Sequence, residues 1–235
     1  MTADSLEKLF DQIPDMVFFV KDREARYTVV NQTLVDRCGL GGKEDLLGRT
    51  VLDIFPAPLG EAYHEQDRGV IETGAPVTDL LELHLYERGE PGWCITTKVP
   101  IRDEGGGGVT GLVGISKDLR LPADEAHGYN ELAESVRYIR SHFGESLRVE
   151  ELARMSSLSA YQYEQRMKRI FQVTAGQYIT KTRIDAACEL LRSTGQQIVD
   201  IAIECGFYDQ SAFARQFKAT TGLTPSRYRA QMKGK

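Results

Sequence analysis

Four polar side chains near the carboxyl end of the chain have the chemistry and the spacing that recognition of DNA bases requires. A helical step of 100° per residue places Ser211, Arg215 and Lys218 roughly opposite the rings of Phe213 and Phe217, and Gln210, in the first turn, can reach forward. An arginine can form two hydrogen bonds with guanine, a glutamine can pair with adenine, and a lysine can hold a phosphate. We therefore expect a helix that fits a major groove, with these residues outward: Gln210, Ser211, Arg215 and Lys218.

A second group of polar side chains occupies equivalent positions earlier in the chain. The stretch ELARMSSLSAYQYEQRMK, residues 151–168, aligns with DIAIECGFYDQSAFARQFK, residues 200–218, with one extra residue in the turn of the later copy. Insertions are tolerated best in turns, so the pattern predicts a duplicated helix-turn-helix. The outward residues of the earlier copy are Tyr161, Glu164, Gln165, Lys168 and Arg169.

The outward residues of the earlier copy suggest a reading role for three side chains. Gln165 is suited to adenine, and Glu164 can accept a hydrogen bond from the amino group of cytosine. Tyr161 can contact a thymine methyl group or a phosphate.

Local signals predict where the helices of each copy begin and end. Ser159 and Asp209 are favourable N-caps for the second helix of the earlier and the later copy. Gly206 can adopt the left-handed conformation that ends a helix, and Phe207 can then fill the turn.

A longer helical segment, residues 177–195, connects the two copies. Its inward stripe is expected to consist of Ile184, Ala187, Cys188 and Leu191. A helix of about 16 residues spans roughly 24 Å. That length is compatible with two helices in successive major grooves, which lie roughly 34 Å apart.

The first half of the chain has the period and the turn residues of antiparallel strands. Runs rich in β-branched and aromatic residues alternate with turns that contain glycine, proline or charged residues. Strands are predicted at 16–20, 27–30, 77–86, 93–101 and 109–119, with helices between the second strand and the third. We expect an α+β domain at 1–120, a linker at 121–130 and an all-α domain with two helix-turn-helix motifs at 131–235.

Charge is distributed unevenly along a chain whose net charge is -5. Residues 1–120 hold 13 Lys and Arg against 21 Asp and Glu, whereas residues 154–235 hold 13 against 6. A basic segment that carries polar helix faces favours contact with a polyanion. No apolar run approaches the roughly 20 residues that span a bilayer, and the first residues resemble no signal peptide, so we expect a cytoplasmic protein without membrane contact.

The sequence gives little support to catalysis or to a bound cofactor. Sequence patterns of nucleophile elbows, zinc hydrolases and phosphate-binding loops are missing, and the four cysteines are spaced singly. His64 and His84 are the histidines of the first domain that a haem would need, and each is better explained as a structural histidine. We expect no cofactor and no metal ion. Tyr63 and Trp93 are the candidates to line a pocket, although ordinary packing explains both.

The segment from about Leu132 to Arg229 resembles the DNA-binding domain of AraC/XylS-type transcription regulators. The residues that carry the resemblance in the later copy are Ile201, Ala202, Gly206, Phe207, Asp209, Gln210, Ser211, Phe213, Arg215, Phe217, Lys218, Gly222, Pro225, Tyr228 and Arg229. The connecting helix matches through Tyr178, Arg183, Ala187, Leu190 and Leu191. The earlier copy departs from the family pattern, which usually has glycine at Ser157 and Gln172, arginine at Gln165 and phenylalanine at Met167.

Residues 10–120 resemble a PAS sensor domain in the order of their strands and helices. The closing Asp118-Leu119 occupies the position of the acidic motif with which that family ends. The resemblance implies a domain that senses a small-molecule effector or a protein partner and that forms homodimers.

The sequence therefore predicts a sequence-specific, DNA-binding transcription regulator, an activator or a repressor, whose activity a sensor domain modulates. Double-stranded DNA, RNA polymerase, an effector and a second copy of the chain are the expected partners. The alternative is a signalling protein whose sensor half recruits a partner and whose DNA binding is vestigial. Some AraC-type domains are fused to alkyl-transfer DNA repair modules, but the lone cysteines here do not fit the zinc-held nucleophile of such enzymes.

Overall fold

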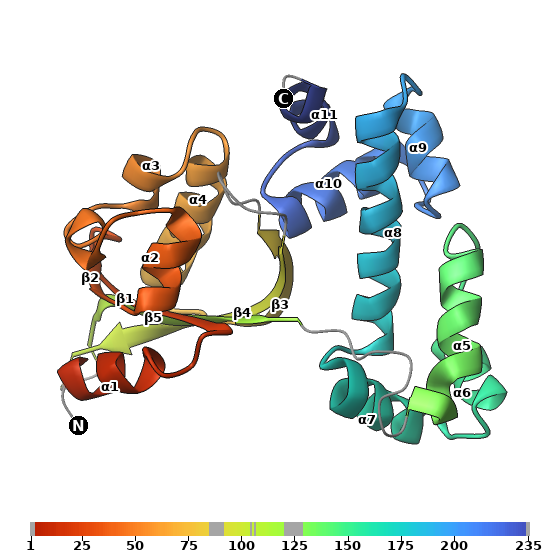
Figure 1. The fold of residues 1–235 in the computed structure, drawn as a ribbon, viewed down its shortest axis with the longest axis horizontal. Helices are drawn as coiled ribbons and strands as arrows, with labels where there is room; N and C mark the ends of the chain where they lie inside the picture. Colours follow the sequence, from red (N-terminus) through yellow and green to blue (C-terminus); the bar gives the residue numbers. More distant parts are fainter. Residues whose placement is uncertain (1–2, 85–91, 104, 106, 120–128, 234–235) are drawn as a thin grey trace. The chain divides into compact units, whose positions relative to one another are not determined.

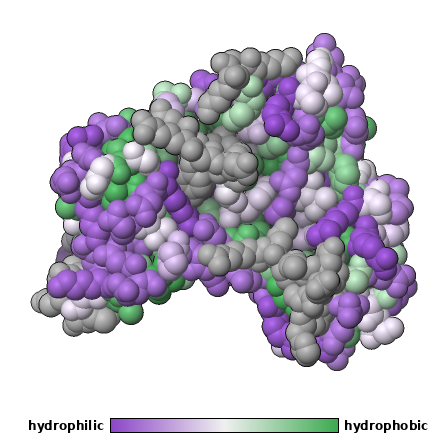
Figure 2. All heavy atoms as spheres, in the orientation of Figure 1, coloured by the Kyte–Doolittle hydropathy of each residue, from purple (hydrophilic) through white to green (hydrophobic). Residues whose placement is uncertain are grey.

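The chain forms two compact units, the first built mainly from residues 1–118 and the second mainly from residues 119–235. The computed structural model describes residues 3–84, 92–103, 105, 107–119 and 129–233 (Figure 1). The expected linker at 121–130 lies outside the described residues up to 128, and residues 129 and 130 already belong to a helix. In the space-filling view, hydrophilic residues cover most of the visible surface of each unit (Figure 2).

The first unit is built on a five-stranded antiparallel sheet, as the period-two pattern predicted. The strands pair in the order β2-β1-β5-β4-β3, so the first and last strands of the unit lie side by side at its centre. Their bounds are Met16–Asp22 (β1), Tyr27–Val30 (β2), Val77–His84 (β3), Gly92–Arg102 (β4) and Val109–Asp118 (β5). The predicted end of the third strand, residues 85 and 86, lies outside the described residues.

Helices cover the sheet of the first unit and enclose its core. The elements are α1 (Ala3–Phe10), α2 (Gln32–Cys38), the 3-10 helix η1 (Lys43–Asp45), α3 (Val51–Ile54) and α4 (Leu59–Thr73). Val17 and Phe19 of β1 pack with Val35 and Val70 in the core. Phe18 points to the other face of the sheet, where Phe10 of α1 stacks on it with ring centroids 4.3 Å apart. Helix α1 was not predicted, because its eight residues carry no strong end signals.

The second unit is entirely helical in its described part, and its helices follow the predicted duplication. They are α5 (Tyr129–His142), α6 (Val149–Met155), α7 (Ala160–Phe171), α8 (Ala175–Ser193), α9 (Ile198–Glu204), α10 (Gln210–Thr221) and α11 (Pro225–Lys233). Helices α6 and α7 form the earlier copy, and α9 and α10 form the later one. Helix α8 connects them and packs against α5, α7, α9 and α11 (Figure 1).

The predicted caps fix the start of both second helices. The Ser159 hydroxyl accepts a hydrogen bond from the Gln162 backbone N–H, and the Gln162 side chain accepts one from the Ser159 N–H. Asp209 Oδ1 accepts a hydrogen bond from the Ala212 N–H at 2.7 Å. These bonds satisfy backbone donors that a helix start would otherwise leave unpaired, so α7 and α10 begin at defined residues.

Helix α8 begins and ends two residues before the predicted segment, and it packs against most of the other helices of the second unit. Its 19 residues correspond to about 28 Å. Ile184, Ala187 and Leu191 are buried as predicted, and Cys188 is half-buried. Arg183 donates hydrogen bonds of 2.8 Å to the backbone oxygens of Phe143 and Glu145, which follow the end of α5. Because one guanidinium holds two orphan carbonyls, α5 and α8 are fixed against each other.

Among the described residues, no helix combines the length and the apolar character that crossing a membrane requires.

Candidate functional site

The outward face of α7 consists of side chains that the packing of the unit leaves exposed. Gln165, Lys168 and Arg169 are all exposed, and Tyr161 retains 73% of its accessible surface. The opposite face is fully buried through Tyr163, Met167 and Phe171. The helix therefore separates a packing face from a polar, basic face, as the spacing predicted.

Glu164 does not lie free on that face, in contrast to the prediction. It is half-buried, and its Oε2 accepts a hydrogen bond of 3.1 Å from the backbone N–H of Ala175, the first residue of α8. A carboxylate at a helix N-terminus satisfies an orphan donor and complements the helix dipole. Position 164 faces the start of the next helix, so the proposed contact with cytosine loses its structural basis.

Two side chains of α7 anchor it to α5. The buried Tyr163 hydroxyl donates to Ser135 Oγ at 3.0 Å, and burial raises the pKa of Tyr163 to about 12. Arg166 pairs with Glu131 of α5. Arg166 is thus engaged within the protein, whereas Tyr161, Gln165, Lys168 and Arg169 are exposed.

The outward face of α10 matches the prediction at each residue. Gln210, Ser211, Arg215 and Lys218 are exposed. Phe213 and Phe217 lie opposite Ser211, Arg215 and Lys218, fully buried, with ring centroids 5.4 Å apart. The aromatic series continues to Phe207 in the turn at one end and to Tyr228 of α11 at the other. This packing fixes the rotation of α10 and therefore the direction of its polar face.

Both turns use a left-handed residue and the same backbone hydrogen bond. Gly206 has φ 78° and the Phe207 N–H donates to the Ala202 oxygen, while Ser157 has φ 54° and the Leu158 N–H donates to the Ala153 oxygen, each at 2.9 Å. A Cβ on Gly206 would lie 2.5 Å from the Phe143 oxygen, so this position requires glycine for two reasons. The duplication seen in the sequence is therefore a duplication of backbone geometry.

The first unit contains a small cavity of about 50 Å³ between its sheet and its helices. Tyr63 lines it, as predicted for a pocket residue. Trp93 does not, because side chains alternate along β4 and Cys94, Thr96 and Lys98 point to the inner face. The assignment of Trp93 to the pocket is therefore wrong.

Buried charges surround the cavity. The Asp67 carboxylate pairs with Lys21 Nζ through one oxygen and with Lys98 Nζ at 2.5 Å through the other, and all three residues are buried. Burial lowers the pKa of Lys21 to about 8, although the charge of Asp67 opposes the change. Asp67 keeps a pKa below the ordinary value, because the attraction of Lys98 and Lys21 exceeds the effect of burial. The sequence did not reveal this cluster, since its members are far apart along the chain.

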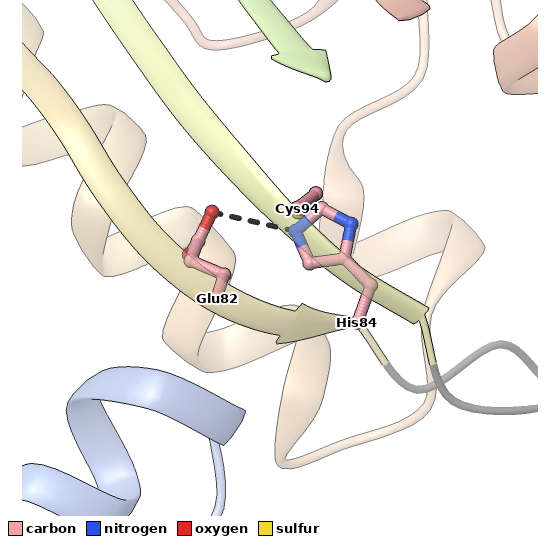
Figure 3. A group of neighbouring side chains, drawn as sticks. All are labelled: Glu82, His84 and Cys94. Atoms are coloured by element: carbon pink, nitrogen blue, oxygen red, sulfur yellow. Dashed lines mark hydrogen bonds and ion pairs between the residues drawn. The ribbon is translucent and has the colours of Figure 1, made fainter. Parts of the chain in front are cut away.

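A second group at the cavity also escaped the sequence analysis. Potential ligand atoms of Glu82, His84 and Cys94 all lie within 4.8 Å of one another (Figure 3). Glu82 is directly paired with Cys94 across the β3–β4 hairpin, and His84 lies two residues along on the same face. Burial alone would raise the pKa of Glu82, but hydrogen bonding with His84 lowers it to about 2. The register of the predicted hairpin was the signal that would have revealed this group.

Both halves of the chain match known protein families. The sequence pattern of a helix-turn-helix domain matches residues 152–231, and that of the PAS fold matches residues 10–121. The chain is 31% identical over 98 residues to the HTH-type transcriptional activator AarP of Providencia stuartii, a stretch that covers 42% of this chain and 73% of AarP. It is 30% identical over 97 residues to the regulatory protein SoxS of Salmonella typhimurium, covering 41% of this chain and 91% of SoxS.

A solved structure of a Vibrio cholerae VqmA dimer is similar over 79% of this chain and 88% of its own, with 25% identity and a TM-score of 0.43. The matches to AarP and SoxS span 73% and 91% of those proteins and about two fifths of this chain. The chain belongs to the AraC/XylS-type helix-turn-helix transcription regulators, and its first half is a PAS fold.

Proposed function

We propose that the chain is a sequence-specific DNA-binding transcription regulator in which α7 and α10 enter successive major grooves. The observation that carries the proposal is the pair of exposed polar faces, each set opposite fully buried core residues in a duplicated helix-turn-helix. A connecting helix of about 28 Å is close to the roughly 34 Å between successive major grooves. Such a helix can present both reading helices to one side of a duplex.

The reading residues differ in their expected roles. Arg215 is suited to guanine and Gln210 to adenine, while Lys218 and Ser211 hold phosphates beside the same groove. In α7, Gln165 is the base-reading candidate, and Tyr161, Lys168 and Arg169 flank it. Since a glutamine replaces the arginine usual in the family, α10 contributes more to sequence preference than α7.

The PAS unit is the sensor domain that controls DNA binding by the second unit. Polar groups at the PAS cavity can contact a small effector, although the cavity of about 50 Å³ has to widen to hold one. PAS units commonly pair, so we expect the active form to be a homodimer. We expect it to act in the cytoplasm. Contact with RNA polymerase would make it an activator. The chain is 38% identical over 98 residues to the bifunctional transcriptional activator and DNA repair enzyme AdaA of Bacillus subtilis. The lone cysteines of this chain give no support to a similar repair activity.

Selection of bound duplexes from a random pool tests the proposal on the full chain. We expect a preferred site with two elements spaced by one helical turn of DNA. The variant Arg215→Ala should lose base preference in one element and Gln165→Ala in the other. Arg192→Ala is the matched control, since Arg192 is exposed in the same unit but lies on α8, paired with Glu189.

Two results would contradict the proposal. One is a pool that shows no enrichment, which would favour the interaction protein with vestigial DNA binding. The other is an Arg215→Ala variant that selects the same site as the unmodified chain, which would mean that the face of α10 does not read bases.

A further inference from the structure

Glu82, His84 and Cys94 form a group of side chains with mixed oxygen, nitrogen and sulfur donors on one face of the β3–β4 hairpin. We propose that this group binds one divalent transition-metal ion, with Zn²⁺ the best match. The proposal goes beyond DNA recognition, because the site lies wholly within the PAS unit. Figure 3 shows Glu82 in contact with the His84 ring, which overlaps Cys94 in this view.

The sheet itself brings the three ligands together. Glu82 and Cys94 are direct partners across an antiparallel ladder, so their side chains project from the same face. His84 follows Glu82 by two residues and shares that face. Two paired strands therefore position all three ligands, which is a firmer support than a loop would give.

The distances suit a tetrahedral ion. Glu82 Oε2 lies 3.3 Å from His84 Nε2. Two ligands that are each about 2.0–2.1 Å from a tetrahedral zinc ion are separated by about 3.3–3.4 Å. The Cys94 sulfur lies within 4.8 Å of both other ligand atoms, and a Zn–S bond of about 2.3 Å requires it to approach by about 1 Å.

Neighbouring groups hold the ligands in place. Gln66 Nε2 donates to the second carboxylate oxygen of Glu82 at 3.0 Å, which leaves Oε2 directed at His84. Thr96 Oγ1 lies 3.7 Å from Cys94 Sγ. The ring of Tyr63 packs against that of His84 with centroids 5.6 Å apart. Such outer contacts orient ligands and commonly change metal affinity about 10–100-fold when they are removed.

The donor set selects the kind of metal. Imidazole and thiolate favour zinc and similar borderline ions over magnesium and calcium, which prefer oxygen ligands alone. Three protein ligands leave one coordination position open. Glu82 and His84 also line the cavity, so the open position is accessible to a small ligand there. Within the described part of the chain, the buried Oε1 of Gln66, also at the cavity, has no protein hydrogen-bond partner and can accept from that ligand.

Titration of the untagged, chelator-treated full chain with Co²⁺ tests the proposal without DNA. We expect one bound ion per chain, the intense visible bands of tetrahedral cobalt and a sulfur-to-cobalt charge-transfer band. Addition of Zn²⁺ should displace the cobalt and remove both kinds of band. Cys94→Ser should abolish the charge-transfer band, and Glu82→Gln or His84→Gln should weaken binding at least tenfold. Cys188→Ser is the control that keeps the spectrum, because Cys188 is a half-buried thiol on α8 in the other unit.

A second measurement uses the unmodified chain and so avoids variants that fail to fold. X-ray absorption at the zinc edge should show one sulfur ligand with nitrogen and oxygen ligands. A zinc shell without sulfur, a spectrum that survives Cys94→Ser, or the absence of stoichiometric binding would overturn the proposal. DNA binding measured on the same samples is a separate readout, so failure of the metal site and failure of the proposed function are distinguishable.

Discussion

Arg215 is the residue whose replacement tests base recognition most directly. Its guanidinium is on the exposed face of α10, opposite the buried Phe213 and Phe217. We expect Arg215→Ala to weaken binding to the preferred site by about 1–3 kcal/mol and to relax preference at one base pair. Fluorescence anisotropy with the preferred duplex and with duplexes altered at single positions measures both effects. An equal loss on all duplexes would instead assign Arg215 to the phosphate backbone.

Asp67 is the residue on which the buried charges of the first unit depend. Asp67→Asn would leave two buried ammonium groups without their shared carboxylate, so we expect a loss of about 3–5 kcal/mol in the free energy of unfolding. Glu72→Gln on the same helix removes an exposed ion pair with Arg68 and should cost less than about 1 kcal/mol. Urea unfolding followed by the fluorescence of Trp93, the single tryptophan, reports on this unit.

Lys21 gives a prediction with a defined pH dependence. Its folded-state pKa of about 8 is below the ordinary value of 10.5, so the cost of burying its charge is present in full below pH 8. As pH rises from about 8 to 10.5, the folded chain loses this proton before the unfolded chain does, and the unmodified protein gains stability. Lys21→Met should therefore be at least as stable at pH 7, with an advantage that shrinks toward pH 10. A pH-independent loss in Lys21→Met would contradict this.

The turns and helix ends of the earlier copy contain two residues that adopt a glycine conformation without being glycine. Ser157 has φ 54° and Gln172 has φ 62°, whereas the later copy has glycine at both equivalent positions, Gly206 and Gly222. A left-handed backbone costs a residue with a Cβ about 1–2 kcal/mol, and replacement by glycine removes that cost. Part of the resulting stabilisation is offset, because glycine raises the conformational entropy of the unfolded chain. We expect Ser157→Gly and Gln172→Gly each to stabilise the chain by about 0.5–1 kcal/mol.

The later copy supplies the opposite experiment. Gly206→Ala should cost more than about 1 kcal/mol, because it combines the left-handed penalty with a contact to the Phe143 oxygen. Unfolding followed by far-ultraviolet circular dichroism measures these changes, because the signal comes mainly from helices and so mainly from the second unit. If Ser157→Gly destabilised the chain, the left-handed conformation of Ser157 would not be a source of strain.

The elements that sequence analysis predicted are those with a clear period or a clear end. Sequence analysis correctly predicted the caps at Ser159 and Asp209, the turn at Gly206 and the five strands, because each depends on residues close together in the chain. Trp93 and the group at Cys94 were misjudged, because their surroundings depend on which face of β4 is inward and on its register with β3. Glu164 was misjudged because its partner, the start of α8, is set by tertiary packing.

At the scale of the whole molecule, the charge distribution allows an acidic protein to bind DNA. Residues 1–120 hold an excess of acidic residues, and residues 154–235 hold an excess of basic ones. Salt screens charges over about 8–10 Å, so a phosphate beside α10 experiences mainly the charges within that distance, which include Arg215 and Lys218 of the same helix face. Removing acidic residues far from α7 and α10 should therefore change DNA affinity little at physiological salt.

The same reasoning predicts how binding depends on salt. Each phosphate contact releases condensed counterions, so the logarithm of the association constant should fall with the logarithm of salt concentration by about 0.9 per contact. Lys218→Ala should weaken binding to all sequences alike and reduce this slope by about 1, because a lysine at a groove edge holds phosphate and reads no base. Arg215→Ala should act mainly on the preferred site, so the two variants separate backbone contact from base contact. Anisotropy titrations over a series of salt concentrations, with preferred and random duplexes, measure both slopes. A slope near zero for the unmodified chain would mean that its basic faces do not meet the phosphate backbone at all.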